Sequence, residues 1–251
     1  MNGELTLSTA LTSMMAGYVL VLVRVGAFMF IAPVFSARFM PTRVRVVVVV
    51  VVAFVAFVGA GQPVPPSWDL GVVARESGLG LLMGVAARAT LEASLALGTV
   101  FSGQIGFSFA QTVDPTAGTH SDVVSDLIAF LSLSMAVALG LHKEAIVLLC
   151  VSVHDLPPGS VFDLHAFVDV AVGHIVGSCA LAARLAFPLM ATTSAGYLAM
   201  GLIARASPGL GVQGLGFTIP VVAGGFALFA FAPAASEIVA RSAVSALHIF
   251  L

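Results

Sequence analysis

Long apolar segments separated by short loops constrain the fold of this chain more than any other feature. The segments span roughly residues 11–35, 44–61, 70–110, 123–153, 167–204 and 212–251. Only 9% of the residues are charged, whereas a typical soluble domain has about 25%. In a bilayer every backbone polar group needs an internal partner, so isolated apolar segments there form helices. We therefore expect an all-α integral membrane protein.

The lengths of the segments are uneven, whereas one membrane-spanning helix needs about 20 residues. The segment 44–61 is short and rich in valine, which favours strands in water, but in lipid we predict a helix. The segment 70–110 has the length for two helices, with a bend near Arg88 and Glu92. The segment 123–153 is overlong and is interrupted by His142, Lys143 and Glu144. The pattern predicts helical hairpins, with some segments broken or not fully spanning.

The loops give a weak signal for topology. Residues 36–45 carry Arg38, Arg43 and Arg45, whereas residues 154–169 carry acids and no Lys or Arg. The positive-inside rule then places residues 36–45 in the cytoplasm and the N-terminus outside. We expect Arg43 and Arg45 to bind anionic membrane lipid or a partner, or to lie in a solvated cytoplasmic loop. The N-terminus lacks a basic region ahead of its apolar segment, so we expect no cleaved signal peptide.

Other classes of function lack support in the sequence. The histidines form no HExxH motif and no GxSxG sequence is present, so no catalytic or metal site is predicted. Cys150 and Cys179 are expected to be buried thiols, no cofactor is predicted, and no basic tract suggests nucleic acid. Residues 209–214 match GxGxxG, but an apolar helical segment precedes them where a dinucleotide site needs a strand. We interpret them as a turn between helices.

Charged residues occur inside the apolar segments, where each is costly against lipid and should face protein or water. They are Arg24, Glu76, Arg88, Glu92, Lys143, Glu144 and Arg184. They suggest either an ion or proton path or pairing between helices or subunits, and pairing is the better-supported interpretation. Small residues at Gly80 and Gly84, and at Gly173 and Gly177, have the spacing that lets membrane helices approach closely.

Residues 103–115, GQIGFSFAQTVDP, combine small residues, amides, phenylalanines and an Asp-Pro turn between apolar segments. A helix that faces lipid has no need for this mixture. Irregular backbone at membrane depth is tolerated only where protein buries it or where it lines a water-filled cavity. The stretch therefore predicts a protein-lined path or a tight subunit contact.

Several short motifs occur in an order and spacing that resemble the flagellar biosynthetic FliR family, including its SctT-like injectisome counterparts, over nearly the whole chain. They are Arg24, Ala32-Pro33, Ser36, Pro41–Arg45, Gly103-Gln104 through Asp114-Pro115, Gly140–His142, Leu156–Gly159, Ala186–Pro188, Ala204-Arg205 with Pro208, and Gly216-Phe217 with Pro220. The chain departs from the family at Leu139, where an asparagine is common.

The resemblance implies a non-enzymatic subunit of the flagellar type III protein export gate. Such a subunit joins FliP-like and FliQ-like proteins in a helical multi-subunit assembly around a channel for unfolded export substrates, with an FlhB-like protein at the base. It implies a multi-pass protein of the bacterial inner membrane in the flagellar basal body. Residues 1–251 then form one export-gate domain, FliP-like over about 1–155 and FliQ-like over about 156–251. Arg205 becomes a further candidate for a buried charge or subunit contact, beside Arg24, Glu76, Arg88, Glu92 and Arg184.

In that family a loop helps to plug the closed channel. The matching positions here are Gly106, Phe107, Phe109, Val113, Asp114 and Pro115. We expect Phe107 and Phe109 to form part of the seal, although packing between subunits is the alternative. A virulence injectisome subunit is an alternative function. A secondary transporter with Arg24, Glu76, Arg88 and Glu92 around a midplane site is more distant, because duplicated halves are not evident.

Overall fold

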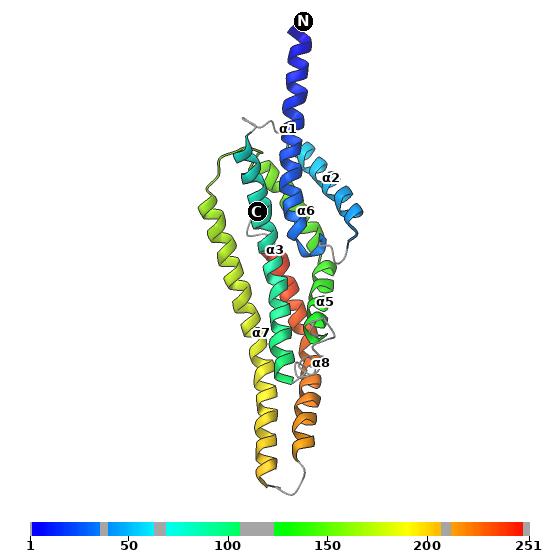
Figure 1. The fold of residues 1–251 in the computed structure, drawn as a ribbon, viewed down its shortest axis with the longest axis vertical. Helices are drawn as coiled ribbons and strands as arrows, with labels where there is room; N and C mark the ends of the chain where they lie inside the picture. The colour runs from blue at the N-terminus through cyan, green and yellow to red at the C-terminus, as the bar shows by residue number, and fades with distance from the viewer. Residues whose placement is uncertain (1, 36–39, 63–68, 106–122, 207–211, 248–251) are drawn as a thin grey trace. The chain divides into compact units, whose positions relative to one another are not determined.

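The computed structural model of the protein describes residues 2–35, 40–62, 69–105, 123–206 and 212–247. All regular structure in these residues is helical (Figure 1). The helices are α1 (Asn2–Ile31), the 3-10 helix η1 (Pro33–Phe35), α2 (Thr42–Gly59), α3 (Leu70–Ile105), α5 (Val123–Ala138), α6 (Leu141–Asp155), α7 (Leu164–Ala206) and α8 (Val212–Leu247). The predicted all-α class is confirmed, and the valine-rich segment forms α2 as predicted.

Five described helices are long and apolar enough to cross a membrane, and α5 with α6 makes a sixth span if the two are counted together. Some helices are far longer than one crossing. Helix α7 has 43 residues, so at about 1.5 Å per residue it measures roughly 65 Å, twice the hydrocarbon thickness of about 30 Å. A single crossing therefore cannot bury the whole length of α7 in lipid.

The structure corrects two predicted helix boundaries. The prediction of two helices in 70–110 was wrong, because α3 runs through Arg88 and Glu92 without a break. No proline interrupts α3, and these two charges are spaced to lie on one face of a helix. The interruption of 123–153 is confirmed, but it lies at Leu139 and Gly140 rather than at His142–Glu144, which lie in the first turn of α6. Gly140 has φ +94°, a conformation that glycine adopts readily.

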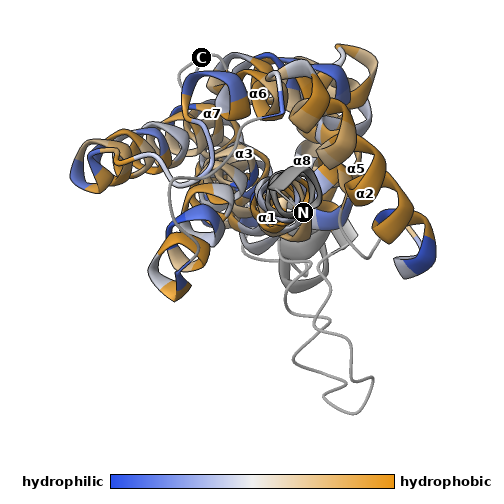
Figure 2. Cartoon of the chain, turned by 90° about the horizontal axis from the view of Figure 1, so that it is seen from above, coloured by the Kyte–Doolittle hydropathy of each residue, from blue (hydrophilic) through white to orange (hydrophobic). Residues whose placement is uncertain are grey.

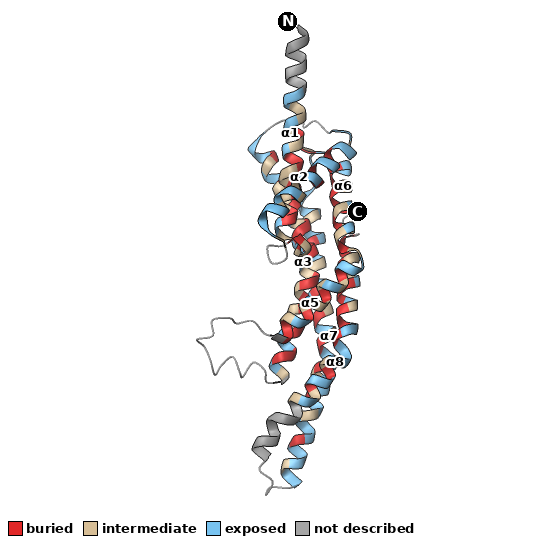
Figure 3. Cartoon of the chain, turned by 90° about the vertical axis from the view of Figure 1, so that its right-hand side faces the viewer, coloured by how far each residue is buried: buried red, intermediate tan, exposed pale blue. Residues whose placement is uncertain are grey.

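The described chain divides into two compact units. Unit 1 comprises residues 1–89, 137–175 and 242–251, and unit 2 comprises residues 90–136 and 176–241. In unit 1, α1 packs against α2, and α2 packs against α6. The hydroxyl of Tyr18 donates to the carbonyl of Val50 at 3.1 Å, and its ring meets Phe57 edge-on at 5.8 Å. Buried apolar residues along α1, shown red in Figure 3, complete the core of unit 1.

Unit 2 has its own apolar core, built from parts of α3, α5, α7 and α8. Its buried residues are Leu97, Phe101, Val124, Ile128, Leu189 and Ala227. Helices α3 and α5 touch through their backbones, because a Cβ on Gly98 would overlap the Cα of Ser125. The hydroxyl of Ser125 also donates to the carbonyl of Leu95 at 2.7 Å.

The start of α7 is fixed by local sequence. The Asp163 carboxylate accepts the backbone N–H of His165 at 2.9 Å, as an N-cap residue does. The rings of Phe162 and Phe167 meet at 5.5 Å across this cap, in the positions of a hydrophobic staple. The cap sets where the connection from α6 ends, and that connection contributes to the site described next.

Candidate functional site

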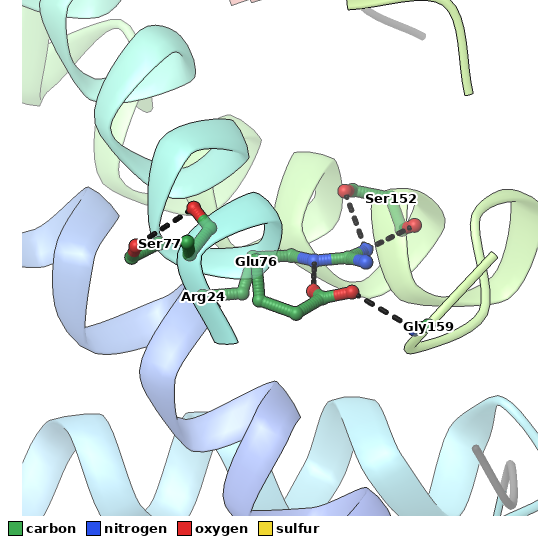
Figure 4. Close-up of polar contacts among 6 residues, drawn as sticks. Arg24, Glu76, Ser77, Ser152 and Gly159 are labelled. Carbon is green, nitrogen blue, oxygen red and sulfur yellow. Dashed lines mark hydrogen bonds and ion pairs between the residues drawn. The ribbon is translucent and has the colours of Figure 1, made fainter. Parts of the chain in front are cut away.

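Arg24 of α1 and Glu76 of α3 form a buried ion pair in unit 1 (Figure 4). The Arg24 Nε atom lies 2.6 Å from Glu76 Oε2, and the two side chains are 0% and 2% exposed. Removing both charges from water is costly, and only close pairing with further hydrogen bonds offsets that cost. The remaining polar atoms of both groups therefore need partners.

The Arg24 guanidinium also forms hydrogen bonds at the end of α6. Its Nη1 donates to the carbonyl of Ser152 at 2.7 Å and meets the Ser152 hydroxyl at 3.2 Å. The same carbonyl accepts the N–H of Leu156 at 3.1 Å, where the helix ends. A cation at a helix C-terminus complements the negative end of the helix dipole. Arg24 therefore links α1 to the last turn of α6.

The second carboxylate oxygen of Glu76 holds the turn between α6 and α7. Glu76 Oε1 accepts the backbone N–H of Gly159 at 3.1 Å. The turn is closed by the N–H of Ser160, which donates to the carbonyl of Pro157 at 3.0 Å. Pro158 and Gly159 occupy its two central positions, and Gly159 has φ +81°, as a type II turn requires. The Pro-Pro-Gly sequence therefore shapes a turn whose Gly159 N–H meets a buried carboxylate.

Glycines on α3 bring the paired helices close enough for this contact. A Cβ on Gly80 would overlap the carbonyl oxygen of Arg24, and a Cβ on Gly84 would lie 3.0 Å from the carbonyl oxygen of Phe28. The predicted close approach at Gly80 and Gly84 is therefore present, between α3 and α1. A Cβ on Gly173 or on Gly177 would meet no described atom within 4 Å.

The chemistry of the pair favours a structural role over proton transfer. Both oxygens of Glu76 accept a hydrogen bond, one from Arg24 and one from Gly159. Arginine cannot be deprotonated in proteins, so Arg24 cannot relay a proton. Within the described residues, only Nη2 of Arg24 lacks a hydrogen-bond partner in this group.

The other predicted charged residues do not share this environment. Arg88, Arg184 and Arg205 are exposed, and Glu92 is half-buried. In α2, Arg43 is exposed and Arg45 is half-buried. Arg38 and the predicted plug residues Gly106, Phe107, Phe109, Val113, Asp114 and Pro115 lie outside the described residues.

The described residues just before the predicted plug segment are held within unit 2. Gln104, in the last turn of α3, accepts a hydrogen bond of 2.7 Å from the hydroxyl of Tyr197 on α7. This bond satisfies one of the carbonyls that a helix C-terminus leaves without an intrahelical partner. The contact therefore ties the end of α3 to α7.

Two partners of the buried pair were missed as site residues. Ser152 is a single hydroxyl in an apolar helix, and its sequence context gives no sign of an arginine nearby. Gly159 was visible as part of a Pro-Pro-Gly turn signal, but a turn signal does not reveal which side chain the turn contacts. Among the described residues, no group of three or more His, Cys, Asp or Glu side chains could hold a metal ion.

Comparison with known proteins adds independent information. The model of the family described as "Bacterial export proteins, family 1" matches residues 15–245. The chain is 27% identical over 208 residues to the flagellar biosynthetic protein FliR of Escherichia coli (strain K12), covering 81% of this chain and 79% of that protein. It is 25% identical to FliR of Caulobacter vibrioides, covering 82% and 84%. It is 23% identical to FliR of Bacillus subtilis (strain 168), covering 81% of each.

Proposed function

This chain belongs to the bacterial export proteins, family 1, and on that premise we propose that it is a subunit of the flagellar type III protein export apparatus. The observation that carries the proposal is the family match over residues 15–245, which includes most of every described helix. The similar proteins from three bacteria are all named flagellar biosynthetic proteins. No catalytic step is assigned to the chain.

The chain contributes to the wall of the channel through which unfolded flagellar proteins cross the inner membrane. Support comes from helices such as α7 that exceed one bilayer crossing, and from an ion pair that is buried between helices rather than facing lipid. The segment with Gly106, Phe107, Phe109, Val113, Asp114 and Pro115 plugs the closed channel. Apolar side chains at a constriction can keep water and ions out.

The partners are FliP-like and FliQ-like subunits, an FlhB-like protein, the unfolded export substrates and membrane lipid. The chain lies in the inner membrane at the flagellar basal body. Its first part, about residues 1–155, is FliP-like, and its second part, about residues 156–251, is FliQ-like. These finer assignments rest on the family resemblance.

A flagellar role is favoured over the equivalent role in a virulence injectisome, because the similar proteins carry flagellar names. A secondary transporter is disfavoured, because both oxygens of Glu76 and the Nε and Nη1 atoms of Arg24 bind partners within the chain itself. Only the buried Nη2 atom of Arg24 has no partner among the described residues. A transporter site needs groups that remain available to a substrate.

Deleting the gene and restoring it from a plasmid tests the proposal. Flagellar filament protein in the medium and swimming in soft agar are measured, with secretion by a Sec-dependent protein as the control. The deletion should abolish flagellar export and swimming while Sec secretion continues, and the plasmid should restore both. A deletion strain that exports flagellar proteins normally would refute the proposal, and selective loss of injectisome secretion would favour the alternative.

A further inference from the structure

Helix α7 presents two opposite faces within unit 2. Its inner face is buried and carries Ser178, Ala182, Ala186, Leu189, Thr193 and Met200. The opposite face, here called the outer seam, is exposed and carries Gly177, Ala180, Arg184, Phe187, Ala191, Ser194, Leu198 and Gly201. These residues recur at alternating steps of three and four, the spacing at which a helix packs along a second helix. Figure 3 shows buried and exposed residues alternating along α7.

The outer seam contains a charged residue, Arg184, that is unfavourable in contact with lipid chains. Arg184 is exposed near the middle of α7. Among the described residues, no hydrogen bond or ion pair joins the Arg184 side chain to another group. A charged side chain inside a membrane helix is expensive against lipid and almost always faces protein or water. At membrane depth Arg184 therefore needs water or a counter-charge, and the described part of this chain supplies no counter-charge.

The backbone carbonyl of Arg184 itself lacks its usual hydrogen bond within α7. Pro188 lies inside α7, four residues after Arg184. Proline has no N–H, so the helix cannot donate its usual hydrogen bond to the carbonyl of Arg184. At membrane depth such a carbonyl needs a partner from a neighbouring helix, a side chain or water. The Arg184 position thus combines a cation with an available carbonyl.

Small residues along the outer seam leave room for a second helix. A Cβ on Gly177 or on Gly201 would meet no described atom within 4 Å. Small residues let membrane helices approach closely, and they are enriched where such helices pack.

Helix α2 shows the opposite arrangement and serves as a contrast. Its small residues Ala53 and Ala56 are buried, whereas bulky apolar residues such as Val47 and Phe54 are exposed. Figure 2 shows α2 as hydrophobic along most of its length. A bulky apolar face whose exposed charge, Arg43, is confined to the first turn of the helix suits lipid chains, whereas the outer seam of α7, with Arg184 near its middle, suits protein.

We propose that the outer seam of α7 binds an apolar membrane helix of another export-apparatus subunit, and that this helix places a carboxylate against Arg184. The inference rests on the proposed function, because it takes the partner from the same apparatus. It goes further by naming the face, the residue and the charge that the partner must carry.

Replacement of Arg184 separates a protein contact from a lipid contact. Arg184→Leu, Arg184→Lys and the control Arg75→Leu, at an exposed arginine of α3, are produced with the complete apparatus. Complex recovered after mild detergent extraction is measured relative to the amount of chain in the membrane. We expect Arg184→Leu to lower recovery roughly tenfold, the change that about 1.4 kcal/mol makes in an association constant. Arg184→Lys and Arg75→Leu should stay within about threefold of wild type, since the first keeps its charge.

Equal or higher recovery of the Arg184→Leu complex would overturn the proposal, because that is what removal of a lipid-facing charge would give. Such a result would leave the proposed function intact, provided that the wild-type chain still restores flagellar export. Failure of the wild-type chain to restore export would instead contradict the proposed function.

Site-specific photo-cross-linking then identifies the partner helix. A benzophenone side chain at Ala180, in the outer seam, is compared with one at Val47, on the exposed face of α2. We expect Ala180 to cross-link to a helix of another export-apparatus subunit, with an Asp or Glu within about one turn of Arg184, and Val47 to give no protein product. Exchanging that acid for arginine should restore assembly to Arg184→Glu. A cross-linked helix without a nearby acid, or no rescue by the exchange, would overturn the proposal.

Discussion

Glu76 on α3 accepts a hydrogen bond of 3.1 Å from the backbone N–H of Gly159, which follows it by 83 residues. The other oxygen of the same carboxylate binds Arg24 of α1. One buried side chain therefore ties the first helix to the turn that leads into α7. Loss of this carboxylate should therefore weaken both the contact between α1 and α3 and the contact between α3 and the turn.

Replacing Glu76 alone should strongly destabilise the chain. Glu76→Leu leaves the Arg24 guanidinium buried without its counter-charge, and breaking a buried ion pair in this way costs about 3–5 kcal/mol. We expect a lower unfolding temperature for the purified chain in detergent, measured by tryptophan fluorescence or by thermal aggregation.

The double replacement Arg24→Met with Glu76→Leu provides the matched control. Exchanging both charges for apolar groups of similar volume removes the unpaired charge, so the double variant should unfold at a higher temperature than Glu76→Leu. If the double variant instead unfolds at or below the temperature of Glu76→Leu, the two charges are not energetically coupled and the structural role is wrong.

Gly159→Ala should weaken the turn that Glu76 holds. The left-handed conformation at φ +81° costs a non-glycine residue roughly 1–2 kcal/mol. Gly78→Ala is the matched control, because a Cβ on this helical glycine of α3 would meet no described atom within 4 Å. That replacement should raise stability by about 0.5–1 kcal/mol. Equal unfolding temperatures for the two variants would argue against a strained turn at Gly159.

The sequence predicts much of the fold, because membrane solvation leaves few choices. Valines in α2 favour strands in water, yet an apolar segment in lipid satisfies its backbone only as a helix. The helix breaks are harder to predict, because charge alone does not interrupt a helix. Arg88 and Glu92 lie within the continuous helix α3, whereas the break before α6 lies at Gly140, a backbone position with positive φ.

The site is predictable only in part, for a different reason. Arg24 and Glu76 stand out as charges among apolar residues, but their pairing depends on α1 and α3 meeting at Gly80. The two bonded residues are 52 positions apart in the sequence. Their spacing does not show which turn of α1 lies beside which turn of α3. The partners Ser152 and Gly159 are set by the same register and so were not evident.

Gly98→Ala should disturb the packing of unit 2. A Cβ at this position would overlap the backbone of Ser125, where α3 and α5 touch. Overpacking of a close contact typically costs about 1–3 kcal/mol. Gly225→Ala, on α8, is the control, because its Cβ would meet no described atom within 4 Å. Limited proteolysis in detergent should cleave Gly98→Ala faster than Gly225→Ala, and equal rates would contradict the tight contact.

Replacing Phe107 and Phe109 together with alanine tests the proposed seal. Without these rings a narrow closed channel should admit water and small ions, because apolar constrictions exclude water by their narrowness and lack of polar groups. The double variant should therefore raise the leak of small ions across the membrane of cells that carry the assembled apparatus, measured with a potential-sensitive dye. Phe130→Ala, at an exposed phenylalanine of α5, should leave the leak at the wild-type level. An unchanged leak in the double variant would reject the seal, and loss of assembled complex would point to packing between subunits instead.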